Sequence, residues 1–398
     1  MKRFKRIDKI KSFKAFLCAL ALVFLFFAVS EFILRNFTSF GDTLSNLEYY
    51  ASLSFSEEEM KTAIKLREEE ATIGSRAVAV PGTIVYRYKT VRTESLNFNS
   101  FGFRGEEPKK KEENEFRIGF FGDSRVAAIY LGEENTLPYI LQKRLQAEFP
   151  NKKITVYNTG VEGYDLPRAA AFAALDSGNL ELDMAVFYVG ANDVNISFDH
   201  DYAYGMWPIF EKEDAVYKHV IENEEMYRKK SFFQRSSLLN AIREAFLSDF
   251  VNSSSSMSKE TVFRPLTPDF ERKADILVAN MKAKAKQTSD ELAARGIMSA
   301  FFLPPLLPLK EPLSTLERNM LYKTEMDYPG STNYSLRCAE SFSESQDPVV
   351  FEQTYIFNGY SQTMFYDGLH FTPEGSRIVG NNVADRIIPM LKNSEKLK

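Results

Sequence analysis

The chain has 398 residues, of which 44% are hydrophobic, so it is long enough for one large domain or two medium ones with a buried core. Residues 1–14 carry seven Lys or Arg against one Asp (+6), so the net charge of −4 leaves −10 on the rest of the chain. A body this acidic argues against nucleic acid as a partner, because phosphate contacts need a basic face. The two cysteines, Cys18 and Cys338, cannot build a disulfide framework or a Cys-based zinc site.

The first predicted element is an apolar segment directly after the basic cluster. Residues 15–30 contain no charge and the apolar run continues to Leu34, which gives 20 residues, enough to cross a bilayer. The positive-inside rule then predicts a single-pass anchor at residues 15–34 of the inner (plasma) membrane, with a cytoplasmic N-terminus and the body outside. A cleaved signal peptide is the alternative, because residues 28–30 offer the small side chains that a signal peptidase requires. The length of the run favours the uncleaved anchor, so residues 1–36 are assigned to it.

Residues 37–112 are predicted to form a juxtamembrane region before the main domain. Ser56 and Glu59 are typical of a capping box at the start of a charge-rich helix that runs to about Ala71. A β-like stretch is expected at residues 83–88, after a Pro-Gly turn. The lysines at residues 109–111, flanked by Glu, predict an exposed linker.

From residue 113 to 395, apolar runs alternate with helical patterns. Strands are expected at residues 116–121, 154–157, 184–189 and 297–303, and helices at residues 137–149, 268–295 and 373–391. Gly296 fits the position after the C-cap of the long helix, and Thr372 fits an N-cap. This alternation predicts a three-layer α/β/α domain with a parallel sheet. Residues 195–267 interrupt the rhythm and are expected to be an insertion.

Chemically useful residues follow the predicted strands, where parallel α/β sheets bind ligands. Ser124 comes just after the first strand, in what should be the first turn of a helix. A serine hydroxyl needs a base to become a nucleophile. Of the three histidines, at positions 200, 219 and 370, His370 is the candidate base, because Asp367 lies three residues before it and can orient the imidazole.

Acyl transfer also needs preorganised donors for the oxyanion. The backbone amide of Ser124 is one candidate. Gly163 can bring a second amide close because it has no side chain, and Asn192 can donate its carboxamide from beyond the third strand.

Each of these short motifs also has an ordinary structural interpretation. A Gly-Asp-Ser triplet is usually a turn, an Asp-x-x-His at a helix start is often a cap, and a Gly-x-Asn-Asp often ends a strand. Their occurrence in one order at successive strand ends favours a site. The sequence Asp199-His200-Asp201 fits a solvated loop better than a metal site, and neither a metal nor an organic cofactor is implied.

Together these motifs resemble the SGNH, or GDSL-type, hydrolase family. The matching blocks are Gly122-Asp123-Ser124, Gly163, Gly190-x-Asn192-Asp193 and Asp367-x-x-His370. The resemblance covers residues 115–392 without the insertion, and implies a flavodoxin-like fold with Ser124, His370 and Asp367 as the catalytic triad and Ser124, Gly163 and Asn192 as the oxyanion hole. Asp123, Gly190 and Asp193 are assigned to support by hydrogen bonding and turn geometry.

One position departs from the family pattern, because Arg125 stands where the name-giving motif has Leu. A cation beside the nucleophile raises the hypothesis that Arg125 binds an anionic group of the substrate, such as a uronate or a phosphate. The alternative is an arginine that reaches solvent or pairs with a nearby Glu.

The sequence thus predicts a membrane-anchored, extracytoplasmic (periplasmic or cell-surface) serine esterase acting through an acyl-serine intermediate. Its expected substrates are O-acetyl or other short acyl esters of cell-envelope or exported polysaccharides. Three alternatives stay open: an O-acyltransferase on the same glycans, a lipase or lysophospholipase on lipid esters, and a non-catalytic envelope scaffold.

Overall fold

A computed structural model of the chain describes residues 54–73, 77–199, 266–343 and 350–394, together with Val29 and Lys396. Apart from Val29, these residues belong to one compact unit, which is the part described below. The predicted membrane segment at residues 15–34 lies outside the described residues except for Val29, and so do residues 200–265 of the predicted insertion. Within the described ranges, no helix combines the length and apolar character needed to span a bilayer.

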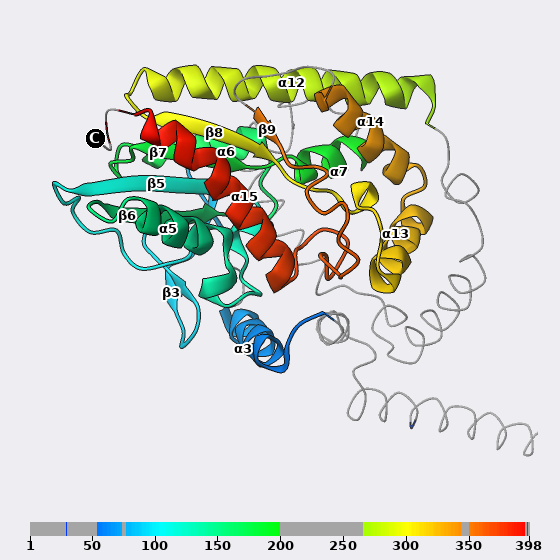
Figure 1. The fold of residues 1–398 in the computed structure, drawn as a ribbon, viewed down its shortest axis with the longest axis horizontal. Coiled ribbons are helices and arrows are strands. Elements are labelled where there is room, and N and C mark those ends of the chain that lie inside the picture. The colour runs from blue at the N-terminus through cyan, green and yellow to red at the C-terminus, as the bar shows by residue number, and fades with distance from the viewer. Residues whose placement is uncertain are drawn as a thin grey trace, which may run out of the picture. The chain divides into compact units, whose positions relative to one another are not determined.

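A five-stranded parallel sheet forms the centre of this unit (Figure 1). Its order is β6-β5-β7-β8-β9, with bounds β5 (Glu115–Gly122), β6 (Lys153–Gly160), β7 (Met184–Tyr188), β8 (Met298–Leu303) and β9 (Val350–Glu352). The first strand, β5, lies between the second and third, which is the flavodoxin-like order. In such sheets the ligand crevice opens at the carboxyl ends of these neighbouring strands, here β5 and β7.

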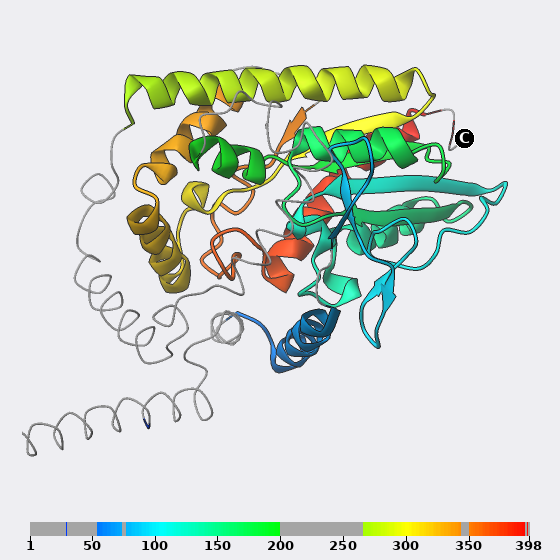
Figure 2. The same cartoon turned by 180° about the vertical axis from the view of Figure 1, so that it is seen from behind.

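Helices cover both faces of the sheet, so the three-layer prediction is confirmed. Helices α5 (Leu137–Glu148) and α15 (Pro373–Lys392) pack together on one face, whereas α6 (Leu166–Asp176) and α12 (Pro268–Ala293) cover the other (Figures 1 and 2). The predicted caps are present. Thr372 accepts a hydrogen bond from the Gly375 amide at 3.1 Å, and Gly296 takes a positive φ of 73° just after α12.

Several short elements were not predicted from the sequence. They are η1 (Glu133–Asn135), α7 (Ala191–Asp199), η3 (Leu307–Leu309), α13 (Thr315–Asp327), α14 (Ser331–Ser343) and the strand β9. The helical turn expected at Ser124 is present as the short helix α4 (Ser124–Ala127). Strand β9 has only three residues, which is too short for an alternating or continuous apolar pattern to be recognised. Helix α6 was also unassigned.

The segment before the sheet contributes to the same core. Helix α3 (Glu57–Ile73) begins at the predicted capping box, in which the Ser56 amide donates to Glu59 at 2.9 Å. Two hairpins follow, formed by β1 (Ala77–Ala79) with β2 (Tyr86–Tyr88) and by β3 (Val91–Arg92) with β4 (Asn97–Phe98). The expected strand at residues 83–88 starts only at β2, because the chain turns between Val80 and Val85. The described residues of the predicted juxtamembrane region thus share one core with the sheet, through buried Leu66, Val85, Leu96, Phe98 and Phe103.

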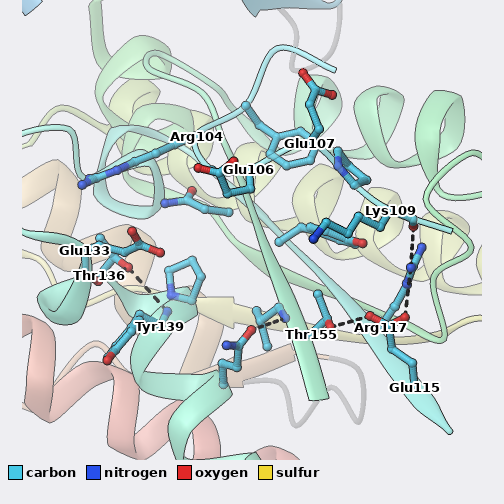
Figure 3. Close-up of a pocket in the computed structure, with 18 of the residues that line it drawn as sticks. Arg104, Glu106, Glu107, Lys109, Glu115, Arg117, Glu133, Thr136, Tyr139 and Thr155 are labelled. Atoms are coloured by element: carbon cyan, nitrogen blue, oxygen red, sulfur yellow. Dashed lines mark hydrogen bonds and ion pairs between the residues drawn. The ribbon is translucent and has the colours of Figure 1, made fainter. Parts of the chain in front are cut away.

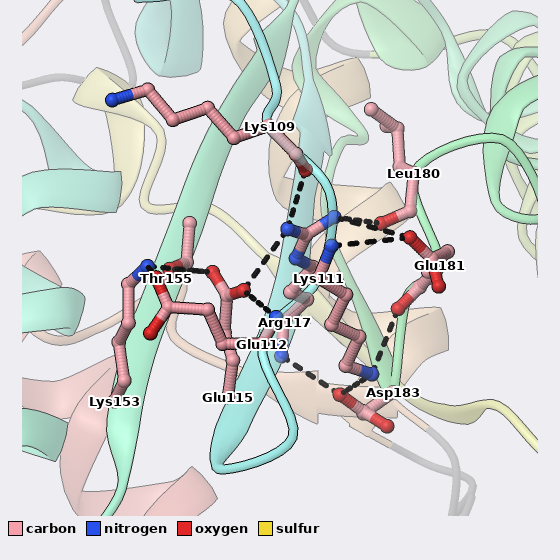
Figure 4. Close-up of polar contacts among 10 residues, drawn as sticks. All are labelled: Lys109, Lys111, Glu112, Glu115, Arg117, Lys153, Thr155, Leu180, Glu181 and Asp183. Atoms are coloured by element: carbon pink, nitrogen blue, oxygen red, sulfur yellow. Dashed lines mark hydrogen bonds and ion pairs between the residues drawn. The ribbon is translucent and has the colours of Figure 1, made fainter.

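The predicted exposed linker at residues 109–111 is only partly correct. Lys109 and Lys110 are exposed, but the Lys111 ammonium pairs with Asp183 at 2.5 Å (Figure 4). The buried guanidinium of Arg117, on β5, donates to the Lys109 carbonyl at 2.6 Å and to the Leu180 carbonyl at 3.2 Å. A charge inside a buried strand needs such partners, and they fasten the segment to the amino end of the sheet.

Candidate active site

The predicted nucleophile and base are neighbours in the folded chain. Ser124 is the first residue of α4, immediately beyond β5, and His370 lies just before α15. The distance from His370 Nε2 to Ser124 Oγ is 2.7 Å, although the two residues are 246 positions apart in the sequence. On the other side of the ring, His370 Nδ1 lies 2.7 Å from Asp367 Oδ2. The three side chains therefore form one continuous hydrogen-bonded line.

A tight hairpin presents the acid and the base together. Phe365 and Phe371 pair in an antiparallel bridge, and the Tyr366 amide donates to the His370 carbonyl at 3.1 Å. At the tip, Asp367 Oδ1 accepts the His370 amide at 2.7 Å, and Gly368 takes a φ of 63°. An aspartate that bonds to backbone amides within its own turn is typical of an Asx-type turn. One carboxylate thus orders the turn with one oxygen and the imidazole with the other.

A buried ion pair anchors this hairpin to α13. Glu317 is 0% exposed, and its Oε1 accepts the amides of Met364 at 2.7 Å and Phe365 at 3.2 Å. Its Oε2 pairs with the ammonium of Lys310 at 2.7 Å and also accepts the Ser314 amide at 2.9 Å. Glu317 was not predicted as a site residue, although the Ser-x-x-Glu capping-box pattern marks its place at a helix start.

In the Asp367–His370 pair, each residue shifts the pKa of the other towards the charged form. Burial by itself lowers the pKa of the His370 imidazole, but the negative charge of Asp367 and the hydrogen bond to it outweigh burial and raise that pKa above 6.5. Burial would raise the pKa of Asp367, yet the charge of His370 and the bonds to the turn amides hold it below 3.8. With Asp367 ionised, the neutral ring carries its proton on Nδ1, so Nε2 is free to accept the serine proton.

Aromatic rings enclose the imidazole. Tyr366 is stacked on His370, with ring centroids 5.8 Å apart and an angle of 18° between the planes. Tyr130 meets the same imidazole edge-on at 5.3 Å and contacts Tyr366 at 4.7 Å. Both tyrosine side chains are buried. The ring of the base is therefore held by packing on its face and its edge as well as by its hydrogen bonds.

The two residues that flank Ser124 form a buried ion pair. Asp123 caps α4 by accepting the Arg125 amide at 2.9 Å, and the Arg125 guanidinium binds both carboxylate oxygens of Asp123. The Arg125 side chain also lies over the rings of Tyr188 and Phe371, at 5.8 and 6.0 Å.

This geometry differs from both hypotheses for Arg125. The residue is 1% exposed, so its side chain offers no surface to an anionic substrate, and it neither reaches solvent nor pairs with a glutamate. The physical reason is the buried Asp123, which is 0% exposed and needs a cation beside it. Arg125 thus supports the turn that presents Ser124.

Two glycines let α4 sit directly on the strand ends. A Cβ at Gly160 would lie 2.3 Å from the backbone nitrogen of Ala127, and one at Gly122 would lie 2.4 Å from Cγ2 of Val126. Any side chain at these positions would push the nucleophile's helix away from the sheet.

The oxyanion candidates follow three adjacent strands. Ser124 follows β5, Gly163 follows β6 with a φ of 75°, and Asn192 lies in the first turn of α7 after β7. Asn192 Nδ2 donates to the Tyr164 carbonyl at 2.9 Å. Because an amide nitrogen carries two hydrogens, this bond orients the carboxamide and leaves one hydrogen for a substrate oxygen.

The predicted supporting residues connect these loops. Asp193 accepts the Leu166 amide at 3.1 Å and so ties the start of α7 to the start of α6. Gly190 takes a φ of 131° in the turn between β7 and α7, where a Cβ would meet Leu303 at 2.5 Å.

A separate hollow of about 280 Å³ runs along the edge strand β6 (Figure 3). Arg104 lines it and donates to the carbonyls of Ala128 at 2.6 Å and Leu131 at 3.0 Å. None of the predicted site residues lines this hollow. In the described ranges no three His, Cys, Asp or Glu side chains gather as metal ligands, and His200 and His219 lie outside those ranges.

No protein-family model and no curated protein matches the chain. Among solved structures, it is similar to a psychrotrophic esterase from Pseudoalteromonas sp., with 15% identity over 71% of this chain and 100% of that one and a TM-score of 0.36. An acetyl xylan esterase matches with 13% identity over 68% of this chain and 100% of that one, at a TM-score of 0.38. A lipase/acylhydrolase from Enterococcus faecalis matches with 13% identity over 69% of this chain and 96% of that one, at a TM-score of 0.35. At these levels of similarity, the roles of Ser124, Asp367 and His370 rest on their own geometry.

Proposed function

We propose that the chain is a serine hydrolase of the SGNH type that cleaves carboxylic esters. The observation that carries this proposal is the hydrogen-bonded line Ser124–His370–Asp367, with 2.7 Å on each side of the imidazole. It lies at the carboxyl end of the sheet beside the position where the strand order reverses, which is where doubly wound sheets bind ligands.

The geometry supports a two-step reaction. His370 Nε2 takes the proton of Ser124 as Oγ attacks the ester carbonyl, and Asp367 stabilises the imidazolium that forms. The Ser124 and Gly163 amides and the Asn192 carboxamide are the proposed donors to the tetrahedral oxyanion. His370 then returns the proton to the leaving alcohol, which leaves an acyl-serine. In the second step, His370 activates a water that releases the acid and restores the serine.

The proposed setting is the outer face of a bacterial cytoplasmic membrane. The basic cluster before residues 15–34 supports a single-pass anchor with the catalytic unit in the periplasm or at the cell surface. Short acyl esters on envelope or exported glycans are therefore the proposed substrates. If a glycan hydroxyl replaces water in the second step, the same site performs acyl transfer.

The test uses the full-length chain in detergent or in its membrane. A fluorophosphonate probe should label the wild type and leave Ser124→Ala unlabelled, and p-nitrophenyl esters of graded acyl length should be hydrolysed by the wild type alone. Adding an acetyl donor with a sugar acceptor distinguishes acetate release from acetyl transfer. An unlabelled wild type, inert towards the whole ester panel, would leave a non-catalytic scaffold and refute the proposal.

A further inference from the structure

A segment outside all the family motifs packs against the catalytic hairpin, that is, the hairpin of residues 365–371 that carries Asp367 and His370. This α3 segment (residues 54–73) precedes the sheet in the sequence and carries none of the predicted site residues. At its start, the ring of Phe55 meets Tyr366 edge-on, with centroids 5.7 Å apart and an angle of 88°. Tyr366 in turn stacks on the imidazole of His370. Phe55 is thus the outer ring of a stack that ends at the proposed base.

The α3 segment is attached firmly enough to hold this ring in place. Ala63 and Leu66 are each only 2% exposed, so one face of α3 is buried. Near its end, Glu69 accepts the backbone amides of Ser95 at 2.8 Å and Leu96 at 3.2 Å. These contacts fix the far end of α3 to the turn between β3 and β4.

The start of α3 is attached to α15, the helix that follows the catalytic hairpin in the sequence. Glu59 pairs with Arg377 at 3.3 Å, and Arg377 lies in the second turn of α15, which begins three residues after His370. Arg377 also donates to Asn135 at 3.1 Å. The chain around His370 is therefore contacted from α3 both before the histidine, through Tyr366, and after it, through Arg377.

We propose that Phe55 is a positioning residue of the active site, and that the α3 segment is part of the catalytic unit rather than a spacer. Tyr366 is 0% exposed, and Phe55 packs against it with the two rings perpendicular. Without that ring, water reaches Tyr366, and the tyrosine and the stacked imidazole can tilt away from Ser124. Proton transfer is sensitive to such tilting, because misplacements of about 1 Å cost up to about 100-fold in rate.

This inference rests on the proposed function and has a direct consequence. The site is complete only when residues 54–73, which lie between the predicted membrane anchor and the sheet in the sequence, are in place. Because Phe55 contacts Tyr366, and Tyr366 stacks on the proposed base His370, loss of Phe55 should affect the reaction step more than binding. We expect Phe55→Ala in the full-length chain to lower kcat about 10-fold with KM within about two-fold, since a partial tilt is a fraction of the limit above.

Three control variants separate positioning from loss of structure. Phe55→Tyr keeps an edge-on ring and should stay within about two-fold of the wild type. Lys61→Ala removes an exposed α3 side chain that pairs with exposed Glu57, and should change nothing. Leu292→Ala removes a buried side chain from α12 at the opposite, amino end of the sheet, and should lower the melting temperature without lowering kcat.

The closing measurement is the rate of fluorophosphonate labelling of Ser124, which reports activation of the serine whatever the natural substrate. Slower labelling in Phe55→Ala, with normal labelling in Phe55→Tyr and Leu292→Ala, supports the inference. An unchanged rate in Phe55→Ala, or an equal loss in Leu292→Ala, overturns it while the proposed function stands. A wild type that is not labelled refutes the proposed function and this inference together.

Discussion

Removing the charge of Glu317 should destabilise the fold and loosen the catalytic hairpin, whose first strand Glu317 contacts directly. Glu317→Gln keeps the size of the side chain but turns an amide towards Lys310, which is 1% exposed and whose ammonium also donates to the Pro312 carbonyl. Breaking a buried ion pair by removing one partner costs about 3–5 kcal/mol, because the other charge stays buried without a counter-charge. Both oxygens of Glu317 are also used by backbone amides, including those of Met364 and Phe365, so little of this loss can be recovered locally.

The matched comparison is the double variant Lys310→Met with Glu317→Gln, which removes both charges. Urea unfolding should show a loss of about 3–5 kcal/mol for the single variant and at least half of that loss regained in the double variant. The kcat of the single variant should fall as well, because the hairpin carries Asp367 and His370. A single variant within about 1 kcal/mol of the wild type, or a double variant no more stable than the single one, would refute the assigned role of the pair.

Two further predictions concern the site itself. His370 must be neutral to accept the serine proton and its pKa is raised above 6.5, so kcat/KM should fall as the pH drops through a midpoint above 6.5. In Asp367→Asn that midpoint should move to lower pH, because burial then acts on the imidazole without the opposing carboxylate. An unmoved midpoint would contradict the assigned pairing of Asp367 with His370. Arg125→Leu should lower turnover of anionic and neutral esters to the same extent, since the buried Arg125 side chain pairs with Asp123 and not with solvent or substrate. The measurement is the ratio of kcat/KM for the two kinds of ester. A selective loss on anionic esters would restore the substrate-binding hypothesis.

Much of the fold could be predicted because its signals are local. Strand β7 is buried along its whole length and is apolar in every position, and α12 has an amphipathic pattern that ends at Gly296. Thr372 marks the start of α15, because its side chain caps the helix through the amide only three residues further along. Several of the elements that escaped prediction lack such signals, although α13 does begin with a capping box at Ser314 and Glu317. Strand β9 is three residues long. The turn marked by the Pro-Gly pair extends to Val85, further than that pair alone indicates, so the expected strand begins only at Tyr86.

The sequence alone determined which residues are candidates for chemistry. Ser124, Asp367 and His370 could be chosen because each belongs to a short motif at a strand or helix end, and because a serine nucleophile requires a base and an acid of those types. The membrane segment at residues 15–34 likewise rests on sequence and stays a prediction.

Only the tertiary structure decided how those residues are held. Whether Arg125 faces a substrate or a carboxylate depends on the burial of its neighbours, which local sequence patterns do not reveal. In the folded chain Arg125 forms a bidentate pair with Asp123. Glu317 and Phe55 reach the catalytic hairpin across 47 and about 310 positions of chain, through contacts that exist only once the helices have packed. Catalytic residues can be recognised from local motifs because the chemistry requires particular side-chain groups. The residues that position them cannot, because any packed side chain of suitable shape and charge can do so.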